Sequence, residues 1–351
     1  MKKKNILGSV AFGIYYILIK FFPNKFYSYI ILFFEKMIHY TKKVSLDDNL
    51  IVDYSVRDIN FKMYVRKQNS QAHYTYTTLL SDGRVYELAI TVALNSILKY
   101  QKKPIFADVG AFIGHYACYV SKALKNDTPV YAIESNDEFC KDIKKSASLS
   151  NIKNIEIING ILSDKEEDLF VYDVGVVNPK EIQSNNIDDK EYIQKVVKFG
   201  KKEKTSTLDS IFKNKEYVPN ILKMDVHGAE GKILAGSNNL LLNNVNFLLM
   251  ELHIANDLKK FSPGFTKTSI VKNLIDHNFN CYLISPHSDG FRNLYSANDN
   301  TQELYLDNKN KLKYQKIEKD TADLVLYDRN FSDIFILAIK DNIDIKSLDC
   351  F

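Results

Sequence analysis

The sequence predicts an α/β protein with a doubly wound, mostly parallel sheet and helices on both faces. From residue 104 onward, short apolar runs alternate with amphipathic stretches of helical spacing, which is the pattern of successive strand–helix units. A glycine turn from Gly110 to Gly114 joins the first of these runs to a helix-compatible stretch. With only 13 glycines and 7 prolines, and no internal repeat, the chain is neither collagen-like nor a repeat protein.

Five apolar runs are the predicted core strands, and further elements flank them. Alternation at 51–65 predicts short strands, and the spacing at 86–98 predicts a helix. After residue 285 the chain is rich in turn residues, with two β-like runs at 324–327 and 334–337. The five core strands are expected at 105–107, 130–133, 155–158, 221–224 and 247–250.

These elements divide the chain into four segments. Residues 1–43 form an apolar, lysine-flanked helical segment, and residues 44–100 supply strands and a helix that lead into the core. The core itself is expected at 101–285, and residues 286–351 complete the domain with β-rich structure.

Composition and charge describe a folded protein with an unusual N-terminus. Of its 351 residues, 45% are hydrophobic and 26% are charged, which excludes a disordered chain. The net charge is +4, but residues 1–43 hold eight lysines and one acid, a net charge of +7, which leaves −3 for the other 308 residues. A mildly acidic body is not typical of a nucleic-acid-binding protein, so no nucleic-acid partner is expected.

The N-terminal segment, residues 1–43, has four possible interpretations. Two short helices bent at Pro23 and lying in a membrane surface are favoured, because the apolar runs are aromatic-rich, flanked by lysine and short for a bilayer span. A buried cap on the catalytic domain, a single spanning anchor and a cleaved signal are the alternatives. No small-residue cleavage site follows Ile19, which disfavours the signal.

The four cysteines are widely spaced and form no zinc-finger pattern. A reduced compartment fits this usage, so a cytoplasmic protein with peripheral membrane contact is expected.

The glycine turn carries the first functional signal. Its spacing is Gly-x-x-x-Gly, and Phe112 stands where the dinucleotide fingerprint has the glycine that makes room for a pyrophosphate. Asp108, two residues before Gly110, would repel phosphates and suits a cationic sulfonium. At the end of the second strand, Glu134 can accept both hydroxyls of a ribose. These residues describe a nucleoside pocket without a phosphate site, and S-adenosylmethionine fits that description.

Five sequence blocks follow one another along the predicted core. They are 108–114, Thr207-Leu208-Asp209, 221–230, 233–236 and 250–253. In this order they resemble the FkbM-type methyltransferases, over residues 83–283. The resemblance implies a Rossmann-like class I methyltransferase fold, with a seven-stranded sheet that has one antiparallel strand. It also implies S-adenosylmethionine as the methyl donor and a hydroxyl of a sugar or polyketide-like molecule as the acceptor. The family pattern usually has Glu at His227, Pro at Ser135 and Asn at Phe112.

Residues at the carboxyl ends of the strands are expected to bind the donor, since ligands of open α/β sheets bind there. Asn159 and Gly160 lie where the adenine rests in the resembling family. Glu87, at the start of the helix before the first core strand, could meet the ammonium group of the donor, but an exposed acid that counters the helix dipole is favoured. The expected cofactor-binding residues are Asp108, Gly110, Ala111, Phe112, Gly114, Glu134, Ser135, Asn159, Gly160 and Asp225.

Two histidines follow adjacent strand ends and are the candidates for catalysis. An alcohol acceptor gains from a general base, for which His227 or His253 is suited, with Asp225 or Glu230 as the orienting acid. Asp225-x-His227 and Glu251-x-His253 also offer oxygens and nitrogens to a divalent ion, but no spacing is diagnostic and no metal is expected. The other histidines are expected to be structural, apart from His115, which is expected to flank the cofactor; they are His39, His73, His277 and His287.

Two other function classes compete with methyl transfer. A nicotinamide-dependent oxidoreductase is opposed by Phe112, and a non-catalytic adenosine-binding or membrane-associated scaffold protein is opposed by the retained acids and His253. The acceptor is expected to be a hydroxyl-bearing molecule, with a glycan or lipid-linked glycan favoured because the N-terminal segment would place the site near a membrane. Residues 171–204 and 256–270 are candidate lids over the acceptor.

Overall fold

A computed structural model describes seven ranges of the chain. The predicted N-terminal segment 1–43 and most of the candidate lid at 171–204 lie outside them. By internal contacts the chain forms two compact units, Met1–Leu50 with Val65–Thr78 and Ile51–Tyr64 with Leu79–Phe351. Nearly all the described residues belong to the second unit, and the fold below is that of this unit. The described ranges are 49–56, 59–66, 86–172, 175–177, 201–285, 311–327 and 333–351.

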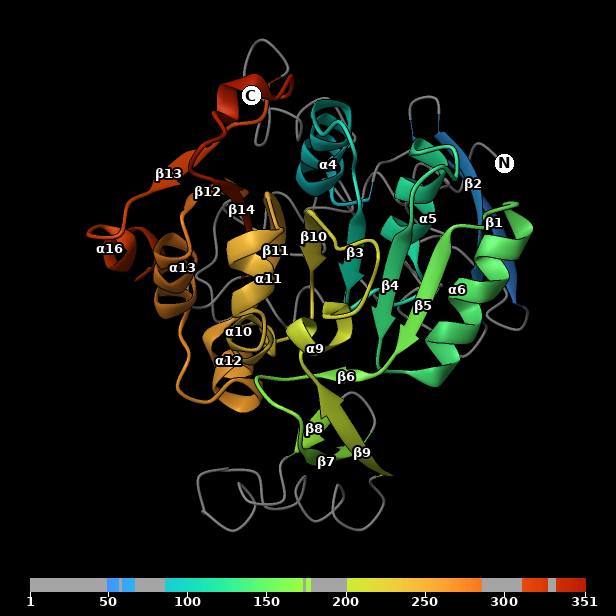
Figure 1. Ribbon diagram of the computed structural model, residues 1–351, viewed down its shortest axis with the longest axis horizontal. Helices are drawn as coiled ribbons and strands as arrows, with labels where there is room; N and C mark the ends of the chain where they lie inside the picture. Colours follow the sequence, from blue (N-terminus) through green and yellow to red (C-terminus); the bar gives the residue numbers. More distant parts are fainter. Residues whose placement is uncertain are drawn as a thin grey trace, which may run out of the picture. The chain divides into compact units, whose positions relative to one another are not determined.

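Eight strands of the described residues form one mixed sheet (Figure 1). The five core strands predicted from the sequence are present as five adjacent parallel strands, β11, β10, β3, β4 and β5. Strand β14 is antiparallel to both β11 and β12, which is the one antiparallel strand expected from the resemblance. In spatial order the strands are β13 (Gln315–Ile317), β12 (Phe279–Ser285), β14 (Ile334–Lys340), β11 (Phe247–Leu252), β10 (Ile221–Met224), β3 (Phe106–Val109), β4 (Val130–Glu134) and β5 (Ile155–Asn159).

The sheet has one strand more than the seven expected. The additional strand, β13, pairs antiparallel with β12 at the sheet edge. Without β13, the remaining seven strands have the order of a class I methyltransferase sheet. Within this sheet the chain begins in the interior strand β3 and adds β4 and β5 on one side. It then crosses back and adds the other strands on the opposite side of β3, so the strand order reverses at β3. Such a reversal is where open α/β sheets bind ligands.

Strand alternation divides the core between two helical layers. Ala107, Val109, Leu222 and Met224 face one layer, and their buried side chains pack with helices α9, α10, α11 and α13. The intervening residues face the other side, where α5 contacts β3 and β4, and α4 contacts β11. Helix α6 packs beside β4 and β5. The bounds are α4 (Leu88–Tyr100), α5 (His115–Ala123), α6 (Asp137–Leu149), α9 (Leu208–Phe212), α10 (Glu230–Ala235), α11 (Asn238–Asn243) and α13 (Lys267–Asp276).

The Thr-Leu-Asp triplet of the resemblance holds two helix starts together. Thr207 and Ser210 form a reciprocal capping box at the start of α9. The Asp209 carboxylate accepts the backbone N–H groups of Asn239 and Leu240, at 3.0 and 2.8 Å, in the first turn of α11. A carboxylate at that position satisfies free N–H groups and complements the helix dipole.

A small sheet follows the carboxyl end of β5, where a long polar insertion was expected. Strands β6 and β9 are parallel, whereas β7 is antiparallel to both β9 and β8. Figure 1 shows this sheet beyond the carboxyl ends of the central strands. The second candidate lid, 256–270, consists of helix α12 (Ala255–Phe261) and the start of α13. The small sheet comprises β6 (Ile161–Leu162), β7 (Asp168–Tyr172), β8 (Gly175–Val177) and β9 (Lys201–Ser206).

Peripheral elements confirm most of the remaining predictions. The alternating stretch forms the hairpin of β1 (Leu50–Val56) and β2 (Ile59–Val65), and the predicted helix at 86–98 is α4. The predicted strand at 334–337 lies within β14.

The prediction of a strand at 324–327 is wrong, because these residues belong to helix α16 (Ala322–Tyr327). Ala322 and Leu326 are buried one helical turn apart, whereas Leu324 is 79% exposed. A strand would have buried alternate residues, whereas this spacing buries one face of a helix.

The four cysteines are unpaired, and three of them are buried. Within the described ranges, no helix combines the length and apolarity that a bilayer crossing needs.

Candidate functional site

The turn after β3 is shaped by close backbone packing. Gly110 and Gly114 have φ of 78° and 84°, which side chains rarely adopt. A Cβ on Gly110 would lie 1.8 Å from the carbonyl oxygen of Asp225, and one on Gly114 would lie 2.9 Å from Ile143. The glycines therefore let the turn pack against the chain after β10 and against α6. Sequence reasoning gave Gly110 a role beside the ligand, and the structure adds this packing role.

Glu134 ties the glycine turn to the end of β4. Its carboxylate accepts the backbone N–H of Phe112 at 2.8 Å and that of Asn136 at 2.9 Å. Burial raises the pKa of Glu134, although these N–H donors oppose the shift. Each carboxylate oxygen has two lone pairs, so acceptor capacity remains for a ligand. Ser135 lies beside it, with its hydroxyl 3.5 Å from the carboxylate.

Phe112 itself lies in the left-handed region, with φ of 51°. Its ring packs edge-on against Phe139 of α6, with a centroid separation of 4.8 Å. Asn159, at the end of β5, donates to the Asp137 carboxylate at 2.8 Å, and nothing lies within 4 Å of a Cβ built on Gly160. Glu134 and Asn159 therefore end the neighbouring strands β4 and β5, and Phe112 and Gly160 lie in the turns after β3 and β5.

Lys223 lies between the carboxylates of two adjacent strands. It pairs in register with Asp108, and its ammonium lies 4.0 Å from that carboxylate and 3.1 Å from Asp225. Burial raises the pKa of Asp108 to about 7, against the attraction of Lys223. Burial opposes the charge on Lys223, but the surrounding carboxylates hold its pKa above the usual value. Sequence reasoning missed this lysine, whose signal was a charged residue inside an apolar strand run.

Two further carboxylates adjoin Asp225. Carboxylate oxygens of Glu87, Asp225 and Glu251 lie within 4.8 Å of one another. Glu87 is 6% exposed and accepts the hydroxyl of Tyr116 at 2.7 Å, so the expectation of an exposed helix-start acid is wrong. Burial and the neighbouring acids raise the pKa of both Glu87 and Glu251. Glu87 comes from the start of α4 and not from a strand end, and the alternative that it contacts the donor therefore stays open.

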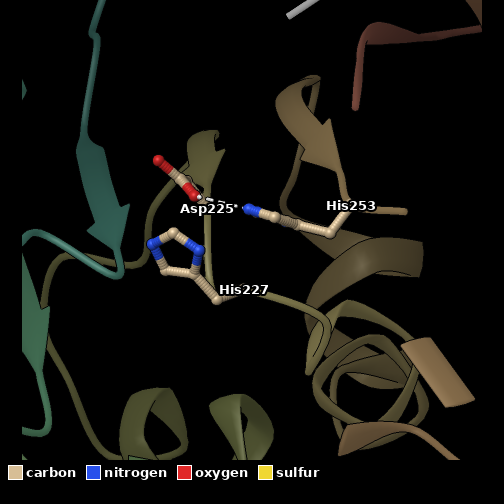
Figure 2. A group of neighbouring side chains, drawn as sticks. All are labelled: Asp225, His227 and His253. Atoms are coloured by element: carbon tan, nitrogen blue, oxygen red, sulfur yellow. Dashed lines mark ion pairs between the residues drawn. The ribbon is translucent and has the colours of Figure 1, made fainter. Parts of the chain in front are cut away.

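Asp225, His227 and His253 meet at the ends of β10 and β11, and Figure 2 shows the three side chains turned toward one another. Nδ1 of His253 lies 2.7 Å from Oε1 of the fully buried Glu230, and Nε2 lies 3.6 Å from Oδ1 of Asp225. The rings of His227 and His253 have centroids 4.6 Å apart. His227 is exposed and has a φ of 49°. The structure thus groups all four residues expected to act in catalysis.

The charges around His253 bear on the role expected of it. Burial disfavours a charged ring, but Glu230 and Asp225 outweigh this effect and raise the pKa of His253 to about 10. The pKa of Asp225 is lowered to about 2, since Lys223 and the histidines outweigh the effect of burial. A general base has to be neutral before it accepts a proton. The raised pKa of His253 therefore opposes the role of general base that the sequence suggested for it.

The remaining histidines have separate positions. His115 is buried and packs edge-on against the rings of Tyr54, Tyr86 and Tyr116, and burial lowers its pKa to about 3. Its ring is therefore neutral and part of an aromatic cluster. His277 ends α13, with Nδ1 2.8 Å from the carbonyl oxygen of Asn273, as a structural residue would be. His39, His73 and His287 lie outside the described residues.

Comparisons with solved structures found several methyltransferases at low similarity. A methyltransferase FkbM from Methylobacillus flagellatus KT is 13% identical with a TM-score of 0.34, over 61% of this chain and 51% of that one. The plantazolicin methyltransferase BamL is 11% identical with a TM-score of 0.37, over 78% and 92% of the two chains. Precorrin-6y C5,15-methyltransferase from Geobacter metallireducens GS-15 is 10% identical with a TM-score of 0.34, over 72% and 89%. No curated protein matched in sequence.

The family comparison is specific to the core. Residues 108–281 match the family model described as the methyltransferase FkbM domain. The matched range begins at Asp108, before the glycine turn, and ends at Cys281 in β12, so it includes Glu134 and the Asp225–His253 region. Over residues 108–281, just under half of the chain, the sequence is therefore similar to the methyltransferase FkbM domain.

Proposed function

We propose that this domain transfers a methyl group from S-adenosylmethionine to a hydroxyl oxygen of its acceptor. The observation that carries the proposal is the set of carboxylates at the carboxyl ends of β3, β4 and β10, next to a glycine turn that lacks the middle glycine of a dinucleotide site. These are Asp108, Glu134 and Asp225. Carboxylates suit ribose hydroxyls and positive charge, and they repel a diphosphate.

The nucleoside half of the donor is assigned to the β3 and β4 ends. Glu134 would accept the ribose hydroxyls with the lone pairs that its two backbone donors leave free. Asn159 and Gly160 would flank the adenine, and the open space at Gly160 supports this assignment. Ala111, Phe112, Gly114 and Ser135 complete the wall around the ribose through the turn that Glu134 holds.

The charged half of the donor is assigned to the centre of the sheet. The ammonium of Lys223 lies beside Asp108 and Asp225, and carboxylate oxygens of Glu87 and Glu251 lie within 4.8 Å of one of Asp225. The raised pKa values of Glu87, Asp108 and Glu251 indicate a site where negative charge is in excess. A ligand with a sulfonium and an ammonium group supplies the missing positive charge.

The acceptor is assigned to the cluster of Asp225, His227, Glu230 and His253. Methyl transfer is a displacement in line with the carbon–sulfur bond, so the enzyme must first place the two reactants in contact. An alcohol must also lose its proton in the transition state. The cluster follows the ends of β10 and β11, next to the proposed donor site, and it contains the groups that can perform this task.

A glycan or lipid-linked glycan is the proposed acceptor, in a cytoplasmic protein that touches the membrane through residues 1–43. The support is the +7 charge of this segment, since each lysine near an anionic surface contributes about 1 kcal/mol of binding. Removal of residues 1–43 is expected to release the protein from the membrane fraction and to leave donor binding intact. Loss of donor binding on truncation would show instead that the segment belongs to the fold.

Thermal stability with added ligands tests the donor. S-adenosylmethionine and S-adenosylhomocysteine are expected to raise the melting temperature in a concentration-dependent way, because both bind only the folded state. NAD is the matched control and is expected to have no effect. A response to NAD alone would refute methyl transfer in favour of an oxidoreductase.

Transfer of a labelled methyl group tests the acceptor. The purified protein is supplied with labelled donor and a cell lysate, which is then separated into glycan, lipid, protein and small-molecule fractions. Label is expected in the glycan or lipid fraction. Donor binding with no label in any fraction would favour the non-catalytic alternative.

A further inference from the structure

We propose that Asp225, His227 and His253 bind one divalent first-row transition-metal ion, through one carboxylate oxygen and two imidazole nitrogens. One ligand atom from each of these residues lies within 4.8 Å of the corresponding atoms of the other two. The three side chains come from the ends of two adjacent parallel strands and are turned toward a common point (Figure 2). No metal was expected from the sequence, because the spacing of these residues is not diagnostic.

The separation of Asp225 and His253 is that of two ligands of one ion. Their facing atoms, Oδ1 and Nε2, are 3.6 Å apart, which is too long for a hydrogen bond. Two atoms that each lie about 2.1 Å from one ion at a tetrahedral angle are about 3.4 Å apart. Within the described part of the chain, Oδ1 of Asp225 is buried and has no hydrogen-bond partner. Both atoms thus face each other at a distance that a shared ion would bridge.

Glu230 supplies an independent observation. It is fully buried, and its Oε1 lies 2.7 Å from Nδ1 of His253. Metal-binding histidines almost always donate the second ring N–H to a carboxylate or carbonyl, which fixes the ring and the tautomer. A histidine ligand must be neutral, and a neutral His253 that donates Nδ1–H to Glu230 directs the lone pair of Nε2 toward Asp225. His253 is only 4% exposed, so this is a buried nitrogen aimed into the cluster.

The third ligand, His227, can complete the site. Its ring is exposed and lies 4.6 Å from that of His253, centroid to centroid. His227 lies two residues after Asp225, and Figure 2 shows its ring beside the Asp225 carboxylate. One of its ring nitrogens lies within 4.8 Å of ligand atoms of Asp225 and His253, and the exposed side leaves further positions for water or a substrate oxygen.

The chemistry of the donors selects the class of ion. Two imidazoles and one carboxylate with open positions suit manganese, iron, cobalt, nickel or zinc, whereas magnesium and calcium prefer oxygen ligands. Lys223 pairs with the other oxygen of Asp225, Oδ2, and leaves Oδ1 for the ion.

The consequence for catalysis rests on the proposed function. An ion at this cluster would coordinate the acceptor hydroxyl and lower its pKa, so that its proton leaves to solvent. The oxygen lone pair then forms the bond to the methyl carbon, and the sulfonium sulfur keeps the electron pair of the bond that breaks. The ion thus takes over the activation otherwise expected of a histidine base.

Cobalt binding tests the proposal on the purified full-length protein after chelator treatment. Calorimetry and visible absorption are expected to show one Co²⁺ per chain with nitrogen and oxygen ligands. Asp225→Asn and His227→Ala are expected to abolish this binding, and Glu230→Gln to weaken it roughly 10- to 100-fold, as loss of a partner behind the ligands does. The control is His277→Ala, which removes a histidine outside the cluster and should leave binding unchanged.

The outcomes of these measurements distinguish failure of the metal site from failure of the methyltransferase assignment. Folding of every variant is checked by circular dichroism, and His227→Ala keeps the test valid if a buried variant fails to fold, since His227 is exposed. Binding of Co²⁺ that survives His227→Ala and Asp225→Asn, or that His277→Ala weakens equally, would overturn the metal site. Binding of S-adenosylhomocysteine by the chelated protein is measured separately. Donor binding without Co²⁺ binding refutes only the metal, and Co²⁺ binding without donor binding refutes only the methyltransferase assignment.

Discussion

The two halves of the site differ in how they are held. At the ends of β3 and β4, the carboxylate of Glu134 accepts main-chain N–H groups from Phe112 and Asn136. At the ends of β10 and β11, Asp225 and His253 face other side chains, and an oxygen of Asp225 has no hydrogen-bond partner within the described ranges. The first half is built mainly by the backbone, and the second mainly by charged side chains.

This difference indicates which half is preformed and which depends on its ligands. A carboxylate that accepts N–H groups of a fixed turn keeps its position with or without a ligand, because the turn is part of the fold. Several buried charges close to one another are costly unless they are paired, so their protonation and geometry respond to what binds. Substitutions in the two halves should therefore have distinct effects.

The largest effect is expected on folding, at the contact between the two halves. Gly110→Ala places a Cβ 1.8 Å from the carbonyl oxygen of Asp225 at a positive φ, so the β3 and β10 ends cannot both keep their positions. We expect a loss of more than about 4 kcal/mol of folding free energy, measured by denaturant unfolding. Gly160→Ala, where nothing lies within 4 Å, is the control and should change stability by less than about 0.5 kcal/mol. Equal effects of the two substitutions would contradict this packing role.

The second-largest effect is expected on turnover, from a substitution at the ends of β10 and β11. His253→Ala removes a member of the acceptor cluster, and we expect methyl transfer to fall by roughly 10²- to 10⁴-fold. Affinity for S-adenosylhomocysteine should stay within about threefold, because His253 is assigned to the acceptor and not to the donor. His277→Ala, outside the site, should change neither quantity. Unchanged turnover in His253→Ala would remove this residue from the mechanism.

A smaller effect is expected on affinity for the donor, from a substitution at the ends of β3 and β4. Glu134→Ala removes the acceptor of two ribose hydroxyls, and hydrogen bonds to a charged group contribute about 1.5 kcal/mol or more each. Calorimetry should therefore show S-adenosylmethionine binding weakened by roughly 100-fold. Glu156→Ala, on the neighbouring strand and exposed, is the matched control. If Glu134→Ala binds the donor as tightly as the natural chain, the ribose assignment is wrong.

The smallest effect is expected on the pH dependence of donor binding. Because burial raises the pKa of Asp108 to about 7, its carboxylate is mostly charged at pH 8 and mostly protonated at pH 6. The charged form attracts the sulfonium, so affinity for S-adenosylmethionine should fall up to roughly tenfold as pH is lowered across this range. S-adenosylhomocysteine has no sulfonium and should change less. An equal change for both ligands would show that Asp108 does not face the sulfonium.

The donor half could largely be predicted from sequence because its residues are close along the chain. The turn from Asp108 to Gly114 and the strand end at Glu134 lie within one strand–helix–strand unit, whose geometry is nearly fixed by right-handed crossover. The packing role of Gly110 could not be predicted, since the atom it avoids belongs to Asp225, more than a hundred residues later.

The sequence by itself determined the parallel sheet, the positions of its five core strands along the chain and the residues at their carboxyl ends. These follow from short-range periodicity and from turn chemistry, which act between neighbours in the chain. Only the tertiary structure decided that Lys223 and Glu87 belong to the site, and that His253 lies between Glu230 and Asp225. Charge interactions in a buried site depend on the distances between residues of separate strands and on their desolvation. Neither can be predicted from the local sequence pattern.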